Sequence, residues 1–236
     1  MLYPYVWNGS WSSNFSEGRM IDRCQCCGTC CRKGPPGLHG ADASLYSSGV
    51  LRKEQLLTLR RGERVYDNVR GRIARLEREM VRIKADSHGG CLFLDQGSNR
   101  CAIYASRPVE CRALQCWDTT DLMRIYDQDR LTRFDLVAPD TALGEIMQAH
   151  EALCGLDGAE RLVSRIKQGE EAAFQELGSL LEQDEAMRQG LQEKAKADPE
   201  ALDFVFGRPL PELLARAGLR VEPGPEGYTL RLAPHS

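Results

Sequence analysis

The cysteines of this 236-residue chain are concentrated in a way that limits what the surrounding segments can form. Five of the ten lie within residues 24–31, and four more follow as Cys91, Cys101, Cys111 and Cys116. A disulfide needs Cα atoms about 4.4–6.8 Å apart and a nearly perpendicular torsion, which adjacent cysteines seldom allow. Five sulfur atoms in eight residues therefore cannot all find disulfide partners among themselves. Thiolates around a metal ion or cluster have no such restriction, so the pattern predicts metal ligation.

The rest of the composition is typical of a globular protein that needs no covalent staples. Hydrophobic residues make up 42% and charged residues 28%, which is enough apolar material for an ordinary core. The formal net charge of −3 argues against nucleic acid or a membrane surface as a partner. The start of the chain, residues 1–7, lacks the basic and apolar regions of a signal peptide, and no run of 18 apolar residues occurs. We therefore expect a cytoplasmic protein, in which thiols stay reduced and clustered cysteines bind metal.

The sequence divides into three segments. Residues 1–23 are expected to form an N-terminal arm, residues 24–125 a cysteine-cluster metal-binding domain, and residues 126–236 a helical C-terminal region. Inside the second segment, apolar residues recur every three or four positions and predict a helical insertion over about 48–84. These apolar residues are Val65, Val69, Ile73, Leu76, Met80 and Ile83. The other face of this basic helix, 64–84, is rich in arginine: a solvated face is favoured, and a docking surface for an acidic protein partner is the alternative.

The remaining patterns predict short strands and further helices. Residues 91–104 suggest a β-hairpin, and the Arg107-Pro108 pair is typical of the start of a short helix carrying Cys111. If hairpin partners sum to 196, Cys91 and Cys101 share a face; if they sum to 195, they point apart. Later helices are expected over 141–153, 158–168, 170–196 and 209–217, with a small hairpin around 222–227. The expected fold class is mainly α with small β-hairpins (α+β).

The spacing of the first cysteine group fits two kinds of site. Cys24-x2-Cys27-x2-Cys30 has the spacing of a ferredoxin-type iron–sulfur loop. Cys24-x2-Cys27-Gly28 also has the form of a zinc knuckle. Spacing does not separate these, although the Cys-x3-Cys-x2-Cys loop of radical S-adenosylmethionine enzymes is absent. The cofactor is therefore expected to be an iron–sulfur cluster or zinc.

Together, the cysteine motifs resemble the YkgJ-type cysteine-cluster (CxxCxxCC) family, described as a zinc- or iron-chelating domain. The resemblance rests on Cys24-x2-Cys27-Gly28-x-Cys30-Cys31, the isolated Cys91, and Cys101-x2-Tyr104-x2-Arg107-Pro108-x2-Cys111. It covers residues 24–41 and 87–117, and the family includes flagellin lysine methylases, for which an iron–sulfur cluster has been proposed. The ligands it implies are Cys24, Cys27, Cys30, Cys31, Cys91, Cys101, Cys111 and Cys116.

Eight thiolates exceed the four of one tetrahedral zinc, so they suit two sites or one cluster with spare thiols. Adjacent Cys30 and Cys31 are expected to point in different directions and to serve different metals or irons. The resemblance gives Tyr104 and Arg107 a place beside the ligands, where an arginine would offset thiolate charge; a structural salt bridge is the alternative for Arg107.

The other candidate ligands are less favoured. Cys26 is expected to be a spare thiol and Cys154 a small buried hydrophobe. His39 and His88 are candidate nitrogen ligands, although eight thiolates leave little need for them.

Three functions remain open from the sequence. The first is a metalloprotein with an iron–sulfur cluster or zinc, which transfers electrons or supports a modification reaction. The second is a zinc-stabilised, non-catalytic protein-interaction module. The third is a protein-modifying enzyme such as a lysine methylase, which the absence of a glycine motif for S-adenosylmethionine disfavours.

Overall fold

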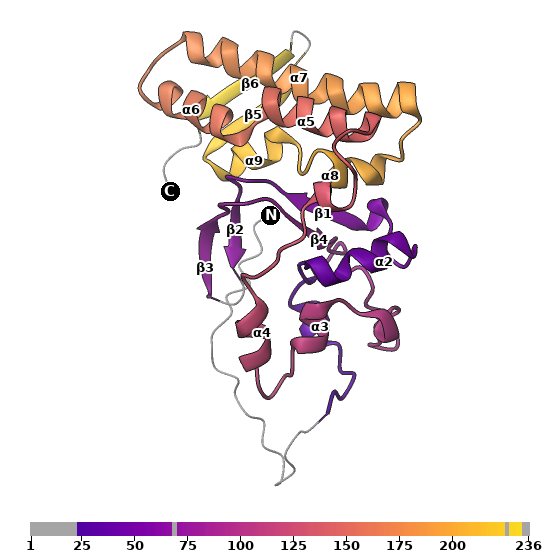
Figure 1. Cartoon of the computed structure of the whole chain (residues 1–236). Coiled ribbons are helices and arrows are strands. Elements are labelled where there is room, and N and C mark those ends of the chain that lie inside the picture. The colour runs from indigo at the N-terminus through magenta and orange to yellow at the C-terminus, as the bar shows by residue number, and fades with distance from the viewer. Residues whose placement is uncertain (1–22, 68–69, 225–226, 233–236) are drawn as a thin grey trace.

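The computed structural model describes residues 23–67, 70–224 and 227–232, so the arm expected over 1–23 lies almost wholly outside the described residues. Helices and three two-stranded antiparallel sheets make up the fold, as expected for the α+β class. The sheet of β1 and β4 lies between the C-terminal helices and the smaller elements α2, α3 and α4 (Figure 1). None of the described helices is long and apolar enough to cross a bilayer.

The helix predicted over 48–84 is wrong, because most of this segment is a β-ribbon. Strand β1 (Leu56–Leu59) pairs with β4 (Met80–Ile83), and β2 (Arg64–Asp67) pairs with β3 (Arg72–Arg75). Leu56 faces Ile83 and Arg64 faces Arg75, so partners sum to 139 in both sheets. The two sheets are therefore successive parts of one long hairpin, interrupted between β1 and β2.

Glycines and burial on two faces explain why the ribbon replaces a helix. Gly62 and Gly71 have φ of 89° and 65°, values that a helix excludes and that tight turns use. All four residues of β1 are buried, whereas Ile73 in the predicted apolar stripe is 71% exposed. The three- and four-residue spacing is thus coincidental, because the apolar side chains belong to alternating faces of different strands.

The N-terminal half carries short helices between these strands. The α-helices are α1 (Thr29–Arg32), α2 (Ala43–Ser47), α3 (Val109–Ala113) and α4 (Thr120–Ile125). The 3-10 turns are η1 (Gly40–Asp42), η2 (Lys53–Gln55), η3 (Tyr104–Ser106) and η4 (Arg133–Asp135).

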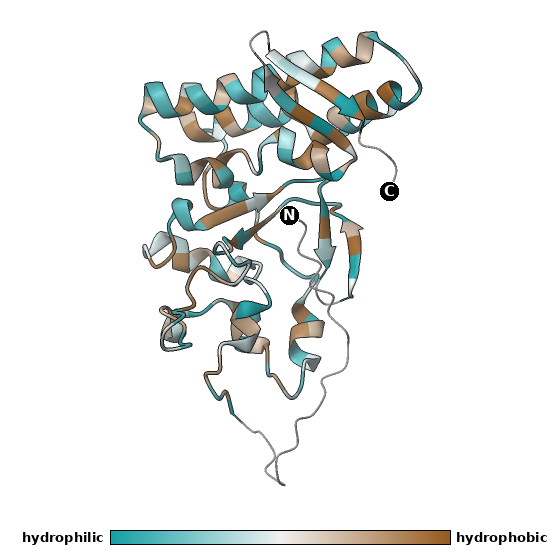
Figure 2. Cartoon of the chain, turned by 180° about the vertical axis from the view of Figure 1, so that it is seen from behind, coloured by the Kyte–Doolittle hydropathy of each residue, from teal (hydrophilic) through white to brown (hydrophobic). Residues whose placement is uncertain are grey.

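The helices predicted after residue 140 are confirmed. They are α5 (Ala142–Cys154), α6 (Leu156–Lys167), α7 (Ala172–Ala195) and α9 (Leu210–Arg216), with η5 (Pro199–Ala201) and α8 (Leu202–Val205) between the last two. The terminal hairpin is also confirmed as β5 (Leu219–Gly224) and β6 (Gly227–Leu232). Polar and apolar residues alternate around these helices (Figure 2), and the apolar sides of α6, α7 and α9 meet β5 in a core of their own.

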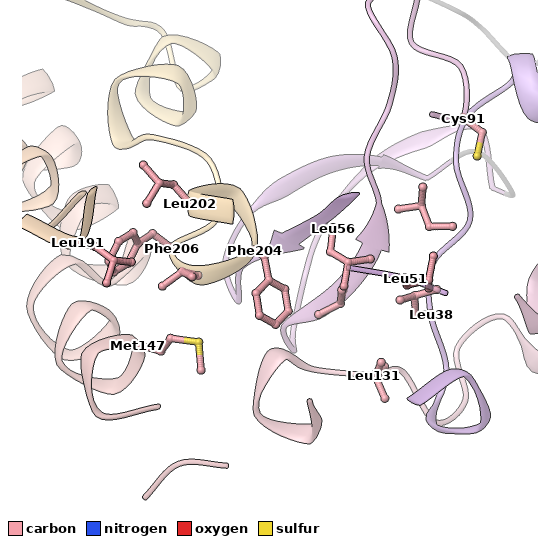
Figure 3. Packing of buried hydrophobic residues seen from close by; sticks show 13 residues of the cluster. Leu38, Leu51, Leu56, Cys91, Leu131, Met147, Leu191, Leu202, Phe204 and Phe206 are labelled. Atoms are coloured by element: carbon pink, nitrogen blue, oxygen red, sulfur yellow. The ribbon is translucent and has the colours of Figure 1, made fainter. Parts of the chain in front are cut away.

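A second core joins the two halves of the chain. Leu56, Leu38 and Cys91 from the N-terminal half belong to the same buried cluster as Met147 and Phe204 from the C-terminal half (Figure 3). The cysteine segment therefore packs onto the helices and does not fold around metal alone.

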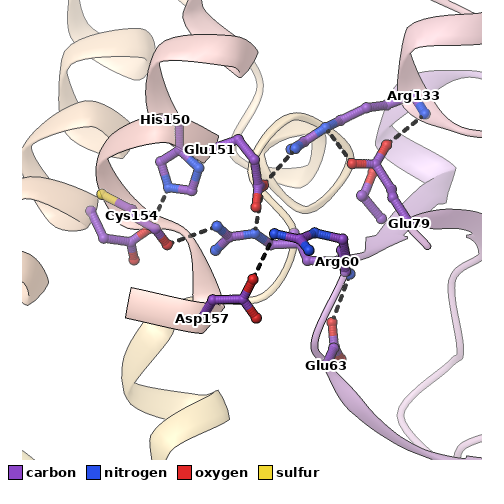
Figure 4. A network of polar contacts seen from close by, with 12 residues as sticks. Arg60, Glu63, Glu79, Arg133, His150, Glu151, Cys154 and Asp157 are labelled. Carbon is purple, nitrogen blue, oxygen red and sulfur yellow. Dashed lines mark hydrogen bonds and ion pairs between the residues drawn. The ribbon is translucent and has the colours of Figure 1, made fainter. Parts of the chain in front are cut away.

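Buried charges reinforce this junction (Figure 4). The side chains of Arg60 and Arg133 are fully buried, and both contact Oε2 of Glu151, at 3.1 Å from Arg60 Nε and 2.9 Å from Arg133 Nη2. Arg60 Nη2 also donates to the Cys154 carbonyl at 2.7 Å, and Arg133 Nη1 donates to the Val205 carbonyl at 2.6 Å. The Glu151 carboxylate on α5 thus pairs with two arginines that precede this helix in the sequence.

Candidate metal centre

The first cysteine group lies on a short loop that turns into α1. Gly28 precedes the helix with φ 72°, and a Cβ there would meet the Asn99 carbonyl oxygen at 3.3 Å and Leu94 Cδ1 at 3.1 Å. Arg32 Nη1 donates to the Cys27 carbonyl at 2.9 Å, and Arg32 also bonds the side chain of Asn99. The glycine therefore lets the loop pack directly against the segment that contains the second cysteine group.

The hairpin predicted over 91–104 does not form. Within this segment the structure has tight turns, with Leu94 N donating to the Cys91 carbonyl at 2.9 Å and Tyr104 N donating to the Cys101 carbonyl at 3.2 Å. Leu94 and Cys101 form an isolated bridge, whose partners sum to 195, and no strand extends from it. The alternation of side chains along paired strands therefore does not determine whether Cys91 and Cys101 point to the same face.

A backbone bond joins the two cysteine groups. Cys91 N donates to the Cys31 carbonyl at 2.8 Å, although the two residues are 60 positions apart. The helix predicted from Arg107-Pro108 is confirmed as α3, which carries Cys111. The Val109 amide at its start donates to Asp42 Oδ1 at 2.9 Å, which ties α3 to η1.

Cys30 and Cys31 form the centre of the cluster, and we call them the central pair. Their Sγ atoms lie 3.9 Å apart, so the expectation that adjacent thiols point in different directions is wrong. The hydrogen bond from Cys31 lowers the pKa of Cys30 to about 6, whereas the same bond raises that of Cys31. Cys30 is thus the first of the pair to become a thiolate, which is the form that binds metal.

We call Cys91, Cys101 and Cys111 the inner thiols, because the charges of the first two both raise the pKa of the third. Burial raises the pKa of Cys111, and the charges of Cys91, Cys30 and Cys101 raise it further. Burial also raises the pKa of Cys91 to about 11, and Cys101 adds to the effect. These mutual effects show that the thiols interact electrostatically, since repulsion between thiolates falls with distance.

We call Cys24, Cys27 and Cys116 the outer thiols; the first two are exposed and Cys116 is half-buried. Burial raises the pKa of Cys116, and Cys30, Cys27 and Cys24 raise it further. In contrast, the Thr29 hydroxyl, 3.2 Å from Cys27 Sγ, lowers the pKa of Cys27. The charges of the predicted ligands thus act on one another, and none of the ten cysteines forms a disulfide.

This donor set fits a soft metal centre. Thiolates select zinc and iron–sulfur clusters over hard cations such as magnesium and calcium. Within the described residues, no three His, Cys, Asp or Glu side chains converge closely enough to hold an ion. Metal binding would therefore have to draw the thiols together from the arrangement described here.

The two residues predicted beside the ligands contact each other. The Arg107 guanidinium carbon lies 4.1 Å from the centre of the Tyr104 ring, which is a cation–π contact. Arg107 forms no ion pair within the described residues, so nothing there supports the salt-bridge alternative. Its charge also contributes to the low pKa of Cys30, after the larger effect of the Cys31 hydrogen bond.

The remaining candidates lie in different surroundings. His39 is buried and directs Nδ1 at the Gln128 carbonyl and Nε2 at Glu110, so both nitrogens already have partners. His88 is exposed in the turn before Cys91, and Cys26 is exposed with φ 52°. Cys154 is fully buried in the core of the C-terminal helices, as expected for a small apolar side chain.

Sequence reasoning missed the ion pairs that Glu110 forms next to Cys111 in the sequence. The Glu110 carboxylate, adjacent to Cys111, accepts from the Gly37 amide at 2.8 Å, from His39 and from Arg130. Burial opposes ionisation of Glu110, but His39 and Arg130 outweigh it and hold the pKa of this carboxyl below its usual value. Gly37 was the sequence signal for this close packing. The structure shows why a glycine is needed there, since a Cβ would lie 2.3 Å from Arg130 Nη1.

A large cleft opens beside the cysteines. Its volume is about 2050 Å³, and all nine clustered cysteines line it. The opposite wall includes Val65, Arg72 and Ala74 of the β2–β3 hairpin, and the floor includes Arg82 of β4. The cluster is thus accessible from one side through a space large enough for a ligand.

Comparison with known proteins finds one family model that matches part of the chain. Residues 23–131 match the family model CxxCxxCC, whose description is "Putative zinc- or iron-chelating domain". The match spans every one of the eight predicted ligands as well as the β-ribbon and the floor of the cleft. No curated protein and no solved structure is significantly similar to the chain. The chain therefore carries a domain of the CxxCxxCC family over residues 23–131.

Proposed function

We propose that the CxxCxxCC domain binds an iron–sulfur cluster through thiolates gathered around Cys30 and Cys31. The observation that carries the proposal is the 3.9 Å separation of these two Sγ atoms, supported by six further thiols whose charges act on the pair or on one another. One tetrahedral zinc takes four ligands, so a pool of eight thiols exceeds its requirement. The Cys24-x2-Cys27-x2-Cys30 spacing is that of a ferredoxin-type loop.

The surroundings of the thiols differ between the two sides, and this supports a reactive role. Cys91 is 6% exposed and Cys111 is half-buried, whereas Cys24 and Cys27 are exposed. When bound, an iron–sulfur cluster supplies one-electron transfer. The inner thiols would anchor it away from water, Arg107 would offset thiolate charge, and the outer side would remain open to an electron partner or a substrate.

Metal content and a visible spectrum test this proposal on protein purified without oxygen and without added metal. Iron with matching sulfide, absorbance near 400 nm and bleaching by dithionite are the expected results. Absence of any metal from protein that is folded by circular dichroism would overturn it.

Structural zinc is the second candidate function, and one contact favours it. Cys91 belongs to the core that also contains Met147 and Phe204, so a metal bound by Cys91 would stabilise both halves of the chain. The same experiment separates the candidates, because stoichiometric zinc in colourless protein would identify a structural centre. The domain would then serve as a zinc-stabilised interaction module without redox activity.

A further inference from the structure

The floor of the cleft contains an arginine without a partner. In strand β4, Val81 and Ile83 point into the core, while Met80 and Arg82 alternate to the other face and line the cleft. The Arg82 side chain makes no hydrogen bond or ion pair within the described residues, and its Nε is shielded from solvent. A buried charged group normally has a partner, because its desolvation otherwise goes uncompensated.

The Glu110 carboxylate, whose charge acts most strongly in favour of ionised Arg82, does not fill this role. Oε2 of Glu110 accepts from the Gly37 amide, while Oε1 is paired with Arg130 and lies 3.3 Å from His39. Arg130 is further placed against the Tyr126 ring, with its guanidinium carbon 4.5 Å from the ring centre. The charges of Glu110 and Arg130 thus balance each other, and Arg82 remains uncompensated beside them. Burial accordingly lowers the pKa of Arg82 to about 10, although Glu110 opposes the shift.

Positively charged residues also outnumber negatively charged ones among the residues that line the cleft. Among the described lining residues, ten arginines and one lysine face six aspartates and glutamates. Arg72 on β3 and Arg78 after it form no ion pair within the part of the chain that the structure describes. The excess is local, because residues 1–125 hold 19 Lys and Arg against 13 Asp and Glu, while residues 126–236 hold 12 against 21.

We propose that this cleft binds a ligand through a carboxylate or phosphate group, which the guanidinium of Arg82 receives next to the cysteine cluster. A planar guanidinium presents paired N–H donors that match either oxyanion. The exposed arginines at the walls would attract the anion, and the half-buried Arg82, whose Nε is shielded from solvent, would hold it. The proposal does not depend on which metal the cysteines bind.

The alternative role for Arg82 is to balance the cysteine thiolates. Arg82 does lower the pKa of Cys91, although burial of that thiol has the larger, opposite effect. Thiolate balance alone would make Arg82 important for metal binding and irrelevant to added anions. Measuring metal content and anion affinity on the same variants therefore separates the two roles.

Calorimetric titration of the metal-loaded full chain at constant ionic strength tests the proposal. Inorganic phosphate and succinate serve as separate probes, which distinguishes a phosphate ligand from a carboxylate ligand. Arg82→Gln is expected to weaken binding of the preferred anion at least about tenfold, since it removes a charged, shielded hydrogen-bond donor. Arg124→Gln is the matched control: it removes one exposed positive charge outside the cleft and should leave affinity unchanged.

Arg72→Gln provides a second variant that does not disturb packing, because Arg72 is exposed on the hairpin. It should weaken binding about two- to fivefold with normal metal content, as expected for one exposed charge. The proposal is overturned if neither anion binds wild-type protein, or if Arg124→Gln weakens binding as much as Arg82→Gln. It is also overturned if Arg82→Gln loses metal while Arg72→Gln leaves anion affinity unchanged, because Arg82 would then act on the cysteines alone.

Discussion

The Sγ atoms of Cys30 and Cys31 lie 3.9 Å apart at the point where two distant cysteine groups meet. A tetrahedral zinc with Zn–S bonds of about 2.3 Å holds its sulfur atoms at roughly this separation. Adjacent cysteines can therefore act at one centre here. Both lie in α1, which begins directly after Gly28.

Replacing a central or an inner cysteine should remove the metal. In Cys30→Ser and in Cys101→Ser, we expect metal affinity to fall at least about tenfold, because a hydroxyl is a poor ligand for zinc or iron. Elemental analysis after dialysis measures the effect. Cys154→Ser is the control and should keep full metal content, while its buried hydroxyl lowers the free energy of unfolding by roughly 1–2 kcal/mol. Equal metal loss in all three variants would contradict the ligand assignment.

Removing the metal should loosen only part of the molecule. The C-terminal helices have a core that contains none of the clustered cysteines, so a chelator should leave most of the helical circular dichroism signal unchanged. Hydrogen exchange should instead accelerate around Cys31 and Cys91, whose backbone bond joins the two cysteine groups. Uniform acceleration through α6 and α7 would show that the helices depend on metal as well.

Glu151 is expected to be a major contributor to stability. Glu151→Gln removes the charge that pairs with both Arg60 and Arg133, whose side chains are fully buried. Arg133 keeps its ion pair with Glu79, but Arg60 has no other ion pair within the described residues. An unpaired buried charge is strongly destabilising, so we expect a loss of about 3 kcal/mol in urea unfolding. The control is Glu160→Gln, which breaks ion pairs with exposed arginines and should cost under about 1 kcal/mol. Similar losses in both variants would mean that burial does not strengthen the Glu151 pairs.

Acid should weaken the C-terminal region through His150. Burial lowers the pKa of His150 below its ordinary value, with Arg60 and Arg188 adding to the effect and Asp184, 2.7 Å away, opposing it. The folded state thus favours neutral histidine, whose Nδ1 has no partner within the described residues. Stability is therefore present at pH 7 and is lost as the pH falls below the unfolded pKa of about 6.5.

Urea unfolding of metal-loaded protein at pH 7.5 and pH 5.5 measures this effect. His150→Gln should lose less stability than the wild type between these two pH values, because glutamine does not take up a proton. Identical losses would assign the acid sensitivity to other groups, such as the cysteine thiolates. The pKa of Asp184 is held low by His150 and Arg188 against the effect of burial, so its own contribution is lost only at lower pH.

One substitution distinguishes the ribbon from the helix expected over 48–84. Alanine in place of a helical glycine stabilises by about 1 kcal/mol, whereas alanine at positive φ destabilises. Gly62 has φ 89°, and a Cβ would lie 3.0 Å from Arg75 Nη2, so Gly62→Ala should cost about 1 kcal/mol or more. Gly178→Ala is the reference, because Gly178 lies inside α7 with open space at its Cβ, and it should stabilise the protein. A stabilising Gly62→Ala would support the helix.

The sequence by itself determined the features that depend on neighbours close along the chain. Helices α5, α6, α7 and α9 follow from apolar residues at helical spacing with glycines between the segments, and the terminal hairpin follows from the Pro- and Gly-rich turn at 222–227. The resemblance of the cysteine motifs to the CxxCxxCC family, described as a "Putative zinc- or iron-chelating domain", also follows from spacing along the chain.

Tertiary structure decided the features that depend on distant partners. Residues 56–83 carry a helical spacing, but burial of β1 on both faces and the turns at Gly62 and Gly71 select the ribbon. Likewise, the isolation of Arg82 arises only because Arg130 and His39, remote in sequence, converge on Glu110. The spacing of residues in the sequence determines only which residues are neighbours within one helix or strand. Which charge is compensated, and which thiols meet, depends on how the elements pack.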